Sequence, residues 1–127
     1  MISKSPITTI IPVDDMSRAT TFYRDTLGLT DLGDSMAGNH ALRTAAGSAV
    51  ELMPAPGEHT SHTVLSFEVD DIVREIADLE GRGVRFEDYD TPELKTEGHI
   101  ASAGSEKAAW FKDSEGNFLC LHETHLS

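Results

Sequence analysis

Hydrophobic positions along the chain form two series with the same order: a strand-like run, a helical stripe and then further strand-like runs. In the first series, strands are predicted over 7–13, 29–32, 40–44 and 49–53, with a helix over 16–27. In the second series, strands are predicted over 62–69, 99–103, 107–112 and 118–123, with a helix over 72–82 and an extended segment over 84–87. β-Branched and alternating apolar residues indicate strands, whereas apolar residues three and four positions apart indicate helices.

Both predicted helices carry recognisable signals at their ends. Asp15 and Asp71 precede the first turns, where an aspartate side chain accepts a free backbone N–H. Gly28 and Gly83 follow the last turns, where a left-handed residue commonly ends a helix. The two helices are therefore expected to begin and end at equivalent places in the two series.

An internal repeat relates the two halves. Val13 and Val69, each followed by two aspartates, are offset by 56 positions. The turn glycines Gly47 and Gly116 are offset by 69 positions, which places Glu51 opposite Cys120. A repeat of this kind predicts one α+β domain over 1–127. It would consist of two tandem βαβββ modules, 1–57 and 58–127, whose mostly antiparallel sheets curl into an incomplete barrel around a cleft.

Composition narrows the classes of function. The net charge of −12 argues against a nucleic-acid partner, which needs basic patches. No apolar run approaches the roughly 20 residues of a membrane span, so no membrane partner is expected. A single cysteine excludes an intrachain disulfide and is typical of a cytoplasmic protein. The excess of acidic residues would attract cationic ligands, although such an excess is also typical of a well-solvated surface.

Two segments of the chain are distinctive. The first runs from Val13-Asp14-Asp15 through Phe22-Tyr23 to Gly28-Leu29, and the second is the hairpin Trp110-Phe111-Lys112-Asp113-Ser114-Glu115-Gly116-Asn117. Both resemble segments of the vicinal oxygen chelate (glyoxalase, bleomycin-resistance protein and dioxygenase) superfamily. The resemblance implies a glyoxalase-like fold. Members differ in chemistry, so it does not by itself imply one activity.

The resemblance also implies where a metal centre would lie. Metal-dependent members take His and Glu ligands from the first and last strands of both modules, and the equivalent positions here are Thr8, Glu51, Val64 and Cys120. Only Glu51 is a usual ligand for a divalent metal. We therefore expect no metal cofactor. The alternative is a divalent metal held by Glu51 with a displaced ligand set that includes His62 and His122.

The same register, with alternate strand residues sharing a face, selects candidate cleft residues. Glu51 is the candidate catalytic base, and a retained hydrogen-bonded residue without catalytic work is its alternative. The candidate ligand-binding residues are His62, Met53, Trp110, Phe118, Cys120 and His122. Each of these side chains could instead pack in the core or lie at the end of a strand. The facing of His40, Arg43 and His99 stays open, and His59 and His125 are expected in exposed loop and tail positions.

These residues leave two classes of function. The first is a metal-free small-molecule-binding protein similar to the bleomycin-resistance branch. The second is a metal-dependent lyase, isomerase or dioxygenase that uses Glu51, with metal-free base catalysis by Glu51 as a weaker variant. Only one of the four ligand positions holds a usual metal ligand, which favours the metal-free binding protein. Whether the protein is an enzyme stays open. The resemblance further implies a homodimer, because chains of this length in the superfamily often complete their clefts with a second copy.

Overall fold

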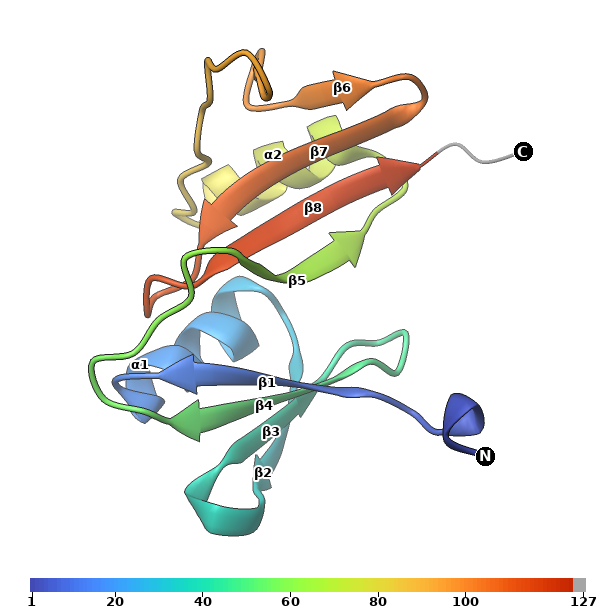
Figure 1. Ribbon diagram of the computed structural model, residues 1–127. Coiled ribbons are helices and arrows are strands. Elements are labelled where there is room, and N and C mark those ends of the chain that lie inside the picture. Colours follow the sequence, from blue (N-terminus) through green and yellow to red (C-terminus); the bar gives the residue numbers. More distant parts are fainter. Residues whose placement is uncertain (125–127) are drawn as a thin grey trace. The chain divides into compact units, whose positions relative to one another are not determined.

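The computed structural model describes residues 1–124, and these residues form two compact units. The first unit is Met1–His59, and the second starts at Thr60. Each contains a strand, a helix and then three strands, all labelled in Figure 1. The predicted α+β fold of two βαβββ modules is confirmed.

The first unit is a four-stranded sheet with the order β1-β4-β3-β2. Its strands are β1 (Thr8–Val13), β2 (Thr30–Asp34), β3 (His40–Arg43) and β4 (Ala49–Pro54). Its helical segments are η1 (Ile2–Lys4), α1 (Met16–Thr21), η2 (Phe22–Thr26) and η3 (Met36–Gly38). β1 pairs with β4 in parallel, whereas the other two pairings are antiparallel. Asp15 caps α1 as predicted, because its Oδ1 accepts the Arg18 N–H at 3.0 Å.

The second unit repeats this topology in the order β5-β8-β7-β6. Its elements are β5 (Thr63–Glu68), α2 (Ile72–Gly81), β6 (Ala101–Ala103), β7 (Glu106–Lys112) and β8 (Phe118–Thr124). β5 pairs with β8 in parallel, and the remaining pairings are antiparallel. Asp71 caps α2 through the Arg74 N–H at 3.1 Å. The strand order is thus the same in both units.

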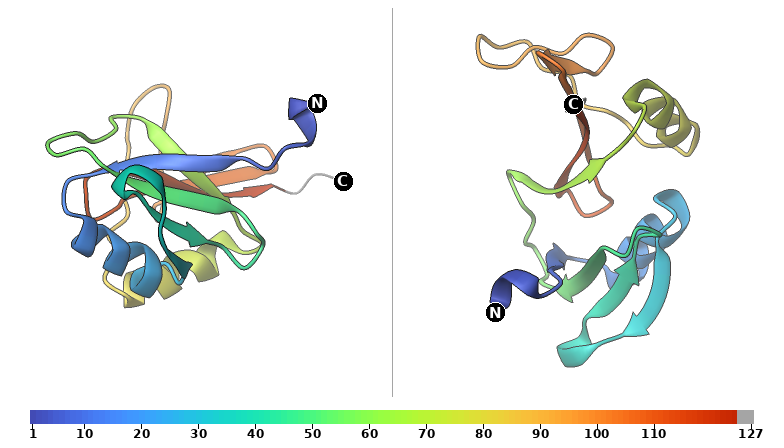
Figure 2. Two further views of the ribbon diagram at one scale, coloured as in Figure 1. Left: turned by 90° about the horizontal axis from the view of Figure 1, so that it is seen from below. Right: turned by 90° about the vertical axis from the view of Figure 1, so that its right-hand side faces the viewer.

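Alternation along the strands separates a core face from a free face in each unit. In the first unit Ile11, Val13, Val50 and Leu52 are buried on the helix side. In the second, Ala109, Phe111, Leu119 and Leu121 are buried together with Ile72, Ile76 and Leu79 of α2. Figure 2 shows each helix on one side of its own sheet. The residues of opposite parity form what we call the free face of each sheet.

A buried polar network closes the β7–β8 hairpin. Asp113 Oδ1 accepts the backbone N–H groups of Glu115 and Asn117 at 2.8 and 2.9 Å. Asn117 is fully buried, and its Oδ1 accepts the Thr60 N–H at 2.8 Å. Gly116 adopts the left-handed φ of 86° that the turn requires. The turn side chains therefore also fix the first residue of the second unit.

Three features differ from the sequence-based expectation or lie beyond it. The helix predicted over 16–27 is α-helical only to Thr21 and continues as a π-helix, η2. Residues 84–87 do not form a strand; Phe86 makes only an isolated bridge to Phe111. The Glu123 carboxylate is buried and accepts the Ile72 N–H at 2.8 Å, so β8 holds the start of α2.

Among the described residues, no helix is long and apolar enough to cross a membrane.

An ionic cluster on the helix side of the first sheet holds its edge strand. His40 Nε2 lies 2.6 Å from Asp31 Oδ1, and its Nδ1 lies 3.1 Å from Asp34 Oδ1. Arg24 of η2 reaches Asp31 at 3.7 Å. Burial alone would lower the pKa of His40, but its hydrogen bonds with Asp34 and Asp31 outweigh burial and the pKa is raised. The Gly33 N–H and then His40 hold the pKa of Asp31 below its usual value.

We predict that His40→Gln lowers the free energy of unfolding by about 1 kcal/mol at about pH 6, and by much less at about pH 9. A raised imidazole pKa stabilises the fold below the unfolded value of about 6.5, and that contribution is lost as the pH rises through the folded-state pKa. Urea unfolding at the two pH values measures the difference. His62→Gln, at an exposed position outside the strands, is the control. A loss that is the same at both pH values would contradict the protonated pair.

Candidate functional site

In the first unit, Glu51 lies on the free face but is already engaged by a loop. Its Oε1 accepts hydrogen bonds from Ser35 Oγ at 2.7 Å and from Asn39 Nδ2 at 3.3 Å. Ser35 and Asn39 flank η3, in which Ala37 has the strained left-handed φ of 59°. The carboxylate thus holds the β2–β3 loop.

The other predicted residue of this unit, Met53, lies at the end of β4 and is 36% exposed. It shares the free face with Glu51 and with Ile10 of β1, which is 44% exposed. Arg43 also has this parity, since it pairs with Ala49. His40, by contrast, pairs with the buried Leu52 and belongs to the helix side.

In the second unit, four predicted residues share the free face of β7 and β8. Trp110 pairs with Cys120, and Lys112 pairs with Phe118. His122 pairs with Ala108, and its Nδ1 lies 2.6 Å from Ser66 Oγ on β5. Phe118 lies under the Lys112 ammonium, 5.1 Å from its ring centre.

Cys120 is buried on this face, and its chemistry follows from burial. Desolvation raises the pKa of the thiol, although hydrogen bonds with Ser66 and the Ala109 backbone act in the opposite direction. The sulfur also lies 3.2 Å from the Leu121 carbonyl oxygen. A protonated, buried thiol is a poor nucleophile and a poor metal ligand.

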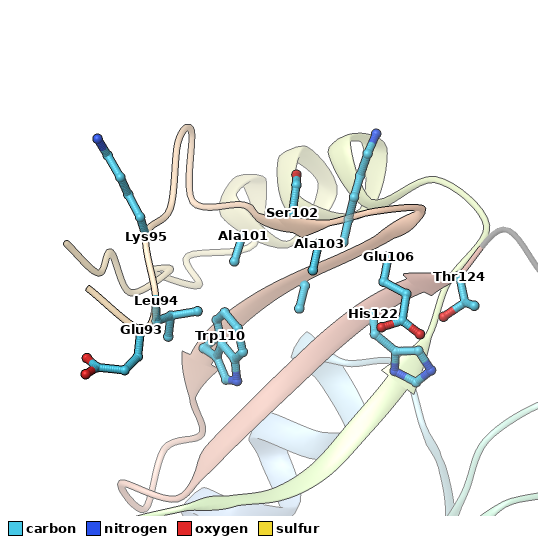
Figure 3. A pocket seen from close by; sticks show the side chains of 12 residues that line it. Glu93, Leu94, Lys95, Ala101, Ser102, Ala103, Glu106, Trp110, His122 and Thr124 are labelled. Carbon is cyan, nitrogen blue, oxygen red and sulfur yellow. The ribbon is translucent and has the colours of Figure 1, made fainter. Parts of the chain in front are cut away.

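A pocket of about 340 Å³ opens on the free face of the second unit. Its apolar lining consists of Leu94, Ala101, Ala103, Ala108 and Trp110. Glu106, His122 and Thr124 provide polar groups, and Glu93 and Lys95 belong to the loop before β6. Figure 3 shows Trp110 on β7 and His122 on β8, with the loop residue Leu94 above the sheet.

The pocket therefore unites two of the predicted ligand-binding residues, Trp110 and His122. Cys120 lies next to Trp110 on the neighbouring strand, but Cys120, Phe118 and His62 do not line the pocket. His62 is an exposed residue just before β5. His99 is held by Asp88 at 3.0 Å and lies 3.5 Å from Glu80 of α2, so it belongs to the helix side. His59 precedes the second unit and is exposed, and His125 lies outside the described residues.

Sequence reasoning missed the loop residue Leu94 and the alanines of the pocket. The alanines had a usable signal, because Ala108 shares the parity of Trp110, and Ala101 pairs with Ala108. Leu94 had none, since residues 88–98 show no strand or helix periodicity.

A family model described as the Glyoxalase/Bleomycin resistance protein/Dioxygenase superfamily matches residues 6–121. The chain belongs to this superfamily. Comparison with curated protein sequences finds no match. Superfamily membership gives the fold, and the chemistry depends on the residues of the site.

Solved structures of the superfamily resemble the chain over nearly its whole length. TnmS3, an antibiotic binding protein from Streptomyces sp. CB03234, is 24% identical with a TM-score of 0.69, covering 98% of this chain and 99% of its own. A superfamily member from Sphaerobacter thermophilus is 24% identical with a TM-score of 0.70, covering 97% and 99%. The fosfomycin resistance protein FosX from Listeria monocytogenes is 17% identical with a TM-score of 0.72, covering 99% and 94%.

The positions that carry metal ligands elsewhere in the superfamily do not fit a metal here. Thr8 and Val64 are poor or impossible ligands, and the buried Cys120 thiol has a raised pKa. Glu51 is the sole usual ligand among the four, and it accepts two loop hydrogen bonds. Within residues 1–124, no three His, Cys, Asp or Glu side chains are grouped closely enough to hold a metal ion.

We predict that Glu51→Ala destabilises the protein by about 1–2 kcal/mol, whereas Glu51→Gln stays close to wild type. The glutamine oxygen still accepts the Ser35 and Asn39 hydrogen bonds, and alanine leaves both donors unpaired. Urea unfolding measures the stability, and amide exchange at residues 35–39 measures the loop. Equal losses in both variants, with the loop unaffected, would contradict the anchoring role.

Proposed function

We propose that this superfamily member is a small-molecule-binding protein that works without the superfamily's metal site. The observation that carries the proposal is the pocket of the second unit, where Trp110 and His122 meet a mostly apolar lining. Ligand pockets in proteins combine an apolar surface with a few polar groups in this way. The fold is shared with a Streptomyces antibiotic binding protein, which is consistent with this role.

The donor set supports the metal-free part of the proposal. A divalent first-row metal needs several imidazole or carboxylate ligands with open positions for substrate. Of the residues at the four positions, only Glu51 offers such a group, and its hydrogen bonds with Ser35 and Asn39 give it a structural task. A metal-dependent lyase, isomerase or dioxygenase is therefore the alternative outcome of the test.

We predict that protein purified without a histidine tag carries well under one equivalent of Zn, Mn, Fe, Ni or Co. A library of small organic molecules, screened by ligand-observed NMR, should yield ligands that bind equally before and after treatment with a chelator. Trp110→Leu should weaken these ligands, because the indole is the largest apolar surface in the pocket. A stoichiometric metal that is lost in Glu51→Gln would establish the metal-dependent alternative, and a screen without ligands would refute the binding role.

We further propose that the protein is a homodimer in the cytoplasm. The free face of the first sheet exposes Ile10 and Met53, and apolar surface of this kind is typical of contacts between chains. Light scattering on the purified protein should give the mass of a dimer. A monomer mass across the accessible concentration range would contradict this proposal and leave the pocket in the second unit intact.

A further inference from the structure

We infer that the pocket of the second unit takes a flat, uncharged ring compound. The inference rests on the proposed binding function and names the class of ligand. It depends on three observations: the charges around the pocket, the fixed position of Trp110 and the small side chains beside it.

The charges around the pocket balance, unlike those of the whole chain. The chain has a net charge of −12, but the charged lining residues are two glutamates, Glu93 and Glu106, and two lysines, Lys95 and Lys107. Lys107 is also 3.9 Å from the Glu123 carboxylate, which is buried outside the lining, so the charges near the pocket depart from balance by no more than one. A ligand with a net charge would enter an apolar surface without a dedicated counter-charge, which is unfavourable. The acidity of the chain therefore does not select a cation at this pocket.

Trp110 packs against a second aromatic ring, which limits its orientations. Tyr89 meets it edge to face, with ring centres 5.6 Å apart and planes at 89°. Partial burial raises the pKa of Tyr89, so the phenol is uncharged at neutral pH. An indole fixed in this way offers a ready surface to another flat ring, at little cost in side-chain entropy.

The free-face positions of β6, and the β7 position that precedes Trp110 on this face, carry only methyl groups. Ala101 of β6 pairs with Ala108 of β7, and Ala103 lies at the end of β6. Branched side chains at these positions would fill the space above the sheet. The volume of about 340 Å³ lies at the lower end of ligand pockets and suits two or three fused rings.

His122 supplies a polar group at the other end of the pocket (Figure 3). Its Nδ1 is taken by Ser66, while its Nε2 is 4.0 Å from Glu68 Oε1, beyond hydrogen-bond distance. Nε2 is thus the nitrogen that remains for a neutral polar substituent of the ligand, such as a hydroxyl or carbonyl group.

The test compares a flat aromatic ligand with a globular saturated one, and an uncharged ligand with two charged ones. 2-Naphthylmethanol and 1-adamantylmethanol have the same number of carbon atoms and the same CH₂OH group, but one is flat and the other globular. 2-Naphthylmethylamine and 2-naphthoate add a positive or a negative charge to the flat ring. By calorimetry, the flat alcohol should bind at least about tenfold more tightly than each of the other three. It should also shift the single indole N–H resonance, because Trp110 is the only tryptophan.

Two variants in which leucine replaces alanine test whether the ligand occupies this pocket. Ala103→Leu should abolish binding of the flat alcohol, whereas Ala77→Leu, at an exposed position of α2, should leave it unchanged. Ala108→Leu provides a second substitution if Ala103→Leu does not fold. Retained binding in a folded pocket variant, or an unshifted indole resonance, would overturn the inference.

The comparison of ligand shapes and the comparison of ligand charges each have a result that would contradict the inference. Equal affinity for the adamantyl alcohol would refute the flat slot, and tighter binding of the amine or the carboxylate would refute charge balance. If none of the four probes binds while library ligands still depend on Trp110, the inference fails and the proposed function stands.

Discussion

Each unit depends on the parallel pairing of its first strand with its last, β1 with β4 and β5 with β8. Parallel neighbours need a crossover connection, and the helix in that connection covers one face of the sheet. The opposite face is left for other contacts in both units. Glu51, Trp110 and His122 lie there because of strand parity. The topology thus decides which residues are available for recognition before any ligand is considered.

Short-range sequence patterns made the strands, the helices and the free faces of the sheets largely predictable. The aspartate caps and the alternation of Val50 and Leu52 with Glu51 depend on neighbours in the chain, so strands, helices and faces could be assigned. The loop over residues 88–98 could not, because it is held by contacts such as Asp88 with His99 that no periodicity encodes. Leu94 was missed for that reason. The π-helical turn after Thr21 was also missed, since its apolar spacing resembles that of an α-helix.

The two last-strand positions that carry metal ligands elsewhere in the superfamily have acquired other interactions. Glu51 holds a strained loop, and Cys120 is a buried thiol next to Trp110 on the neighbouring strand. The loop contact uses Oε1 of the carboxylate group that a metal would need. Retention of an acidic residue at such a position therefore does not imply retention of its chemistry.

The alternation along β7 has a consequence for how the protein can change over generations. Ala109 and Phe111 are fully buried and support folding, while Ala108 and Trp110, which alternate with them, border the pocket. A substitution at one parity costs stability, and a substitution at the other changes the lining of the pocket with little effect on the core. Selection can therefore reshape the pocket one free-face residue at a time on a strand whose folding role stays constant.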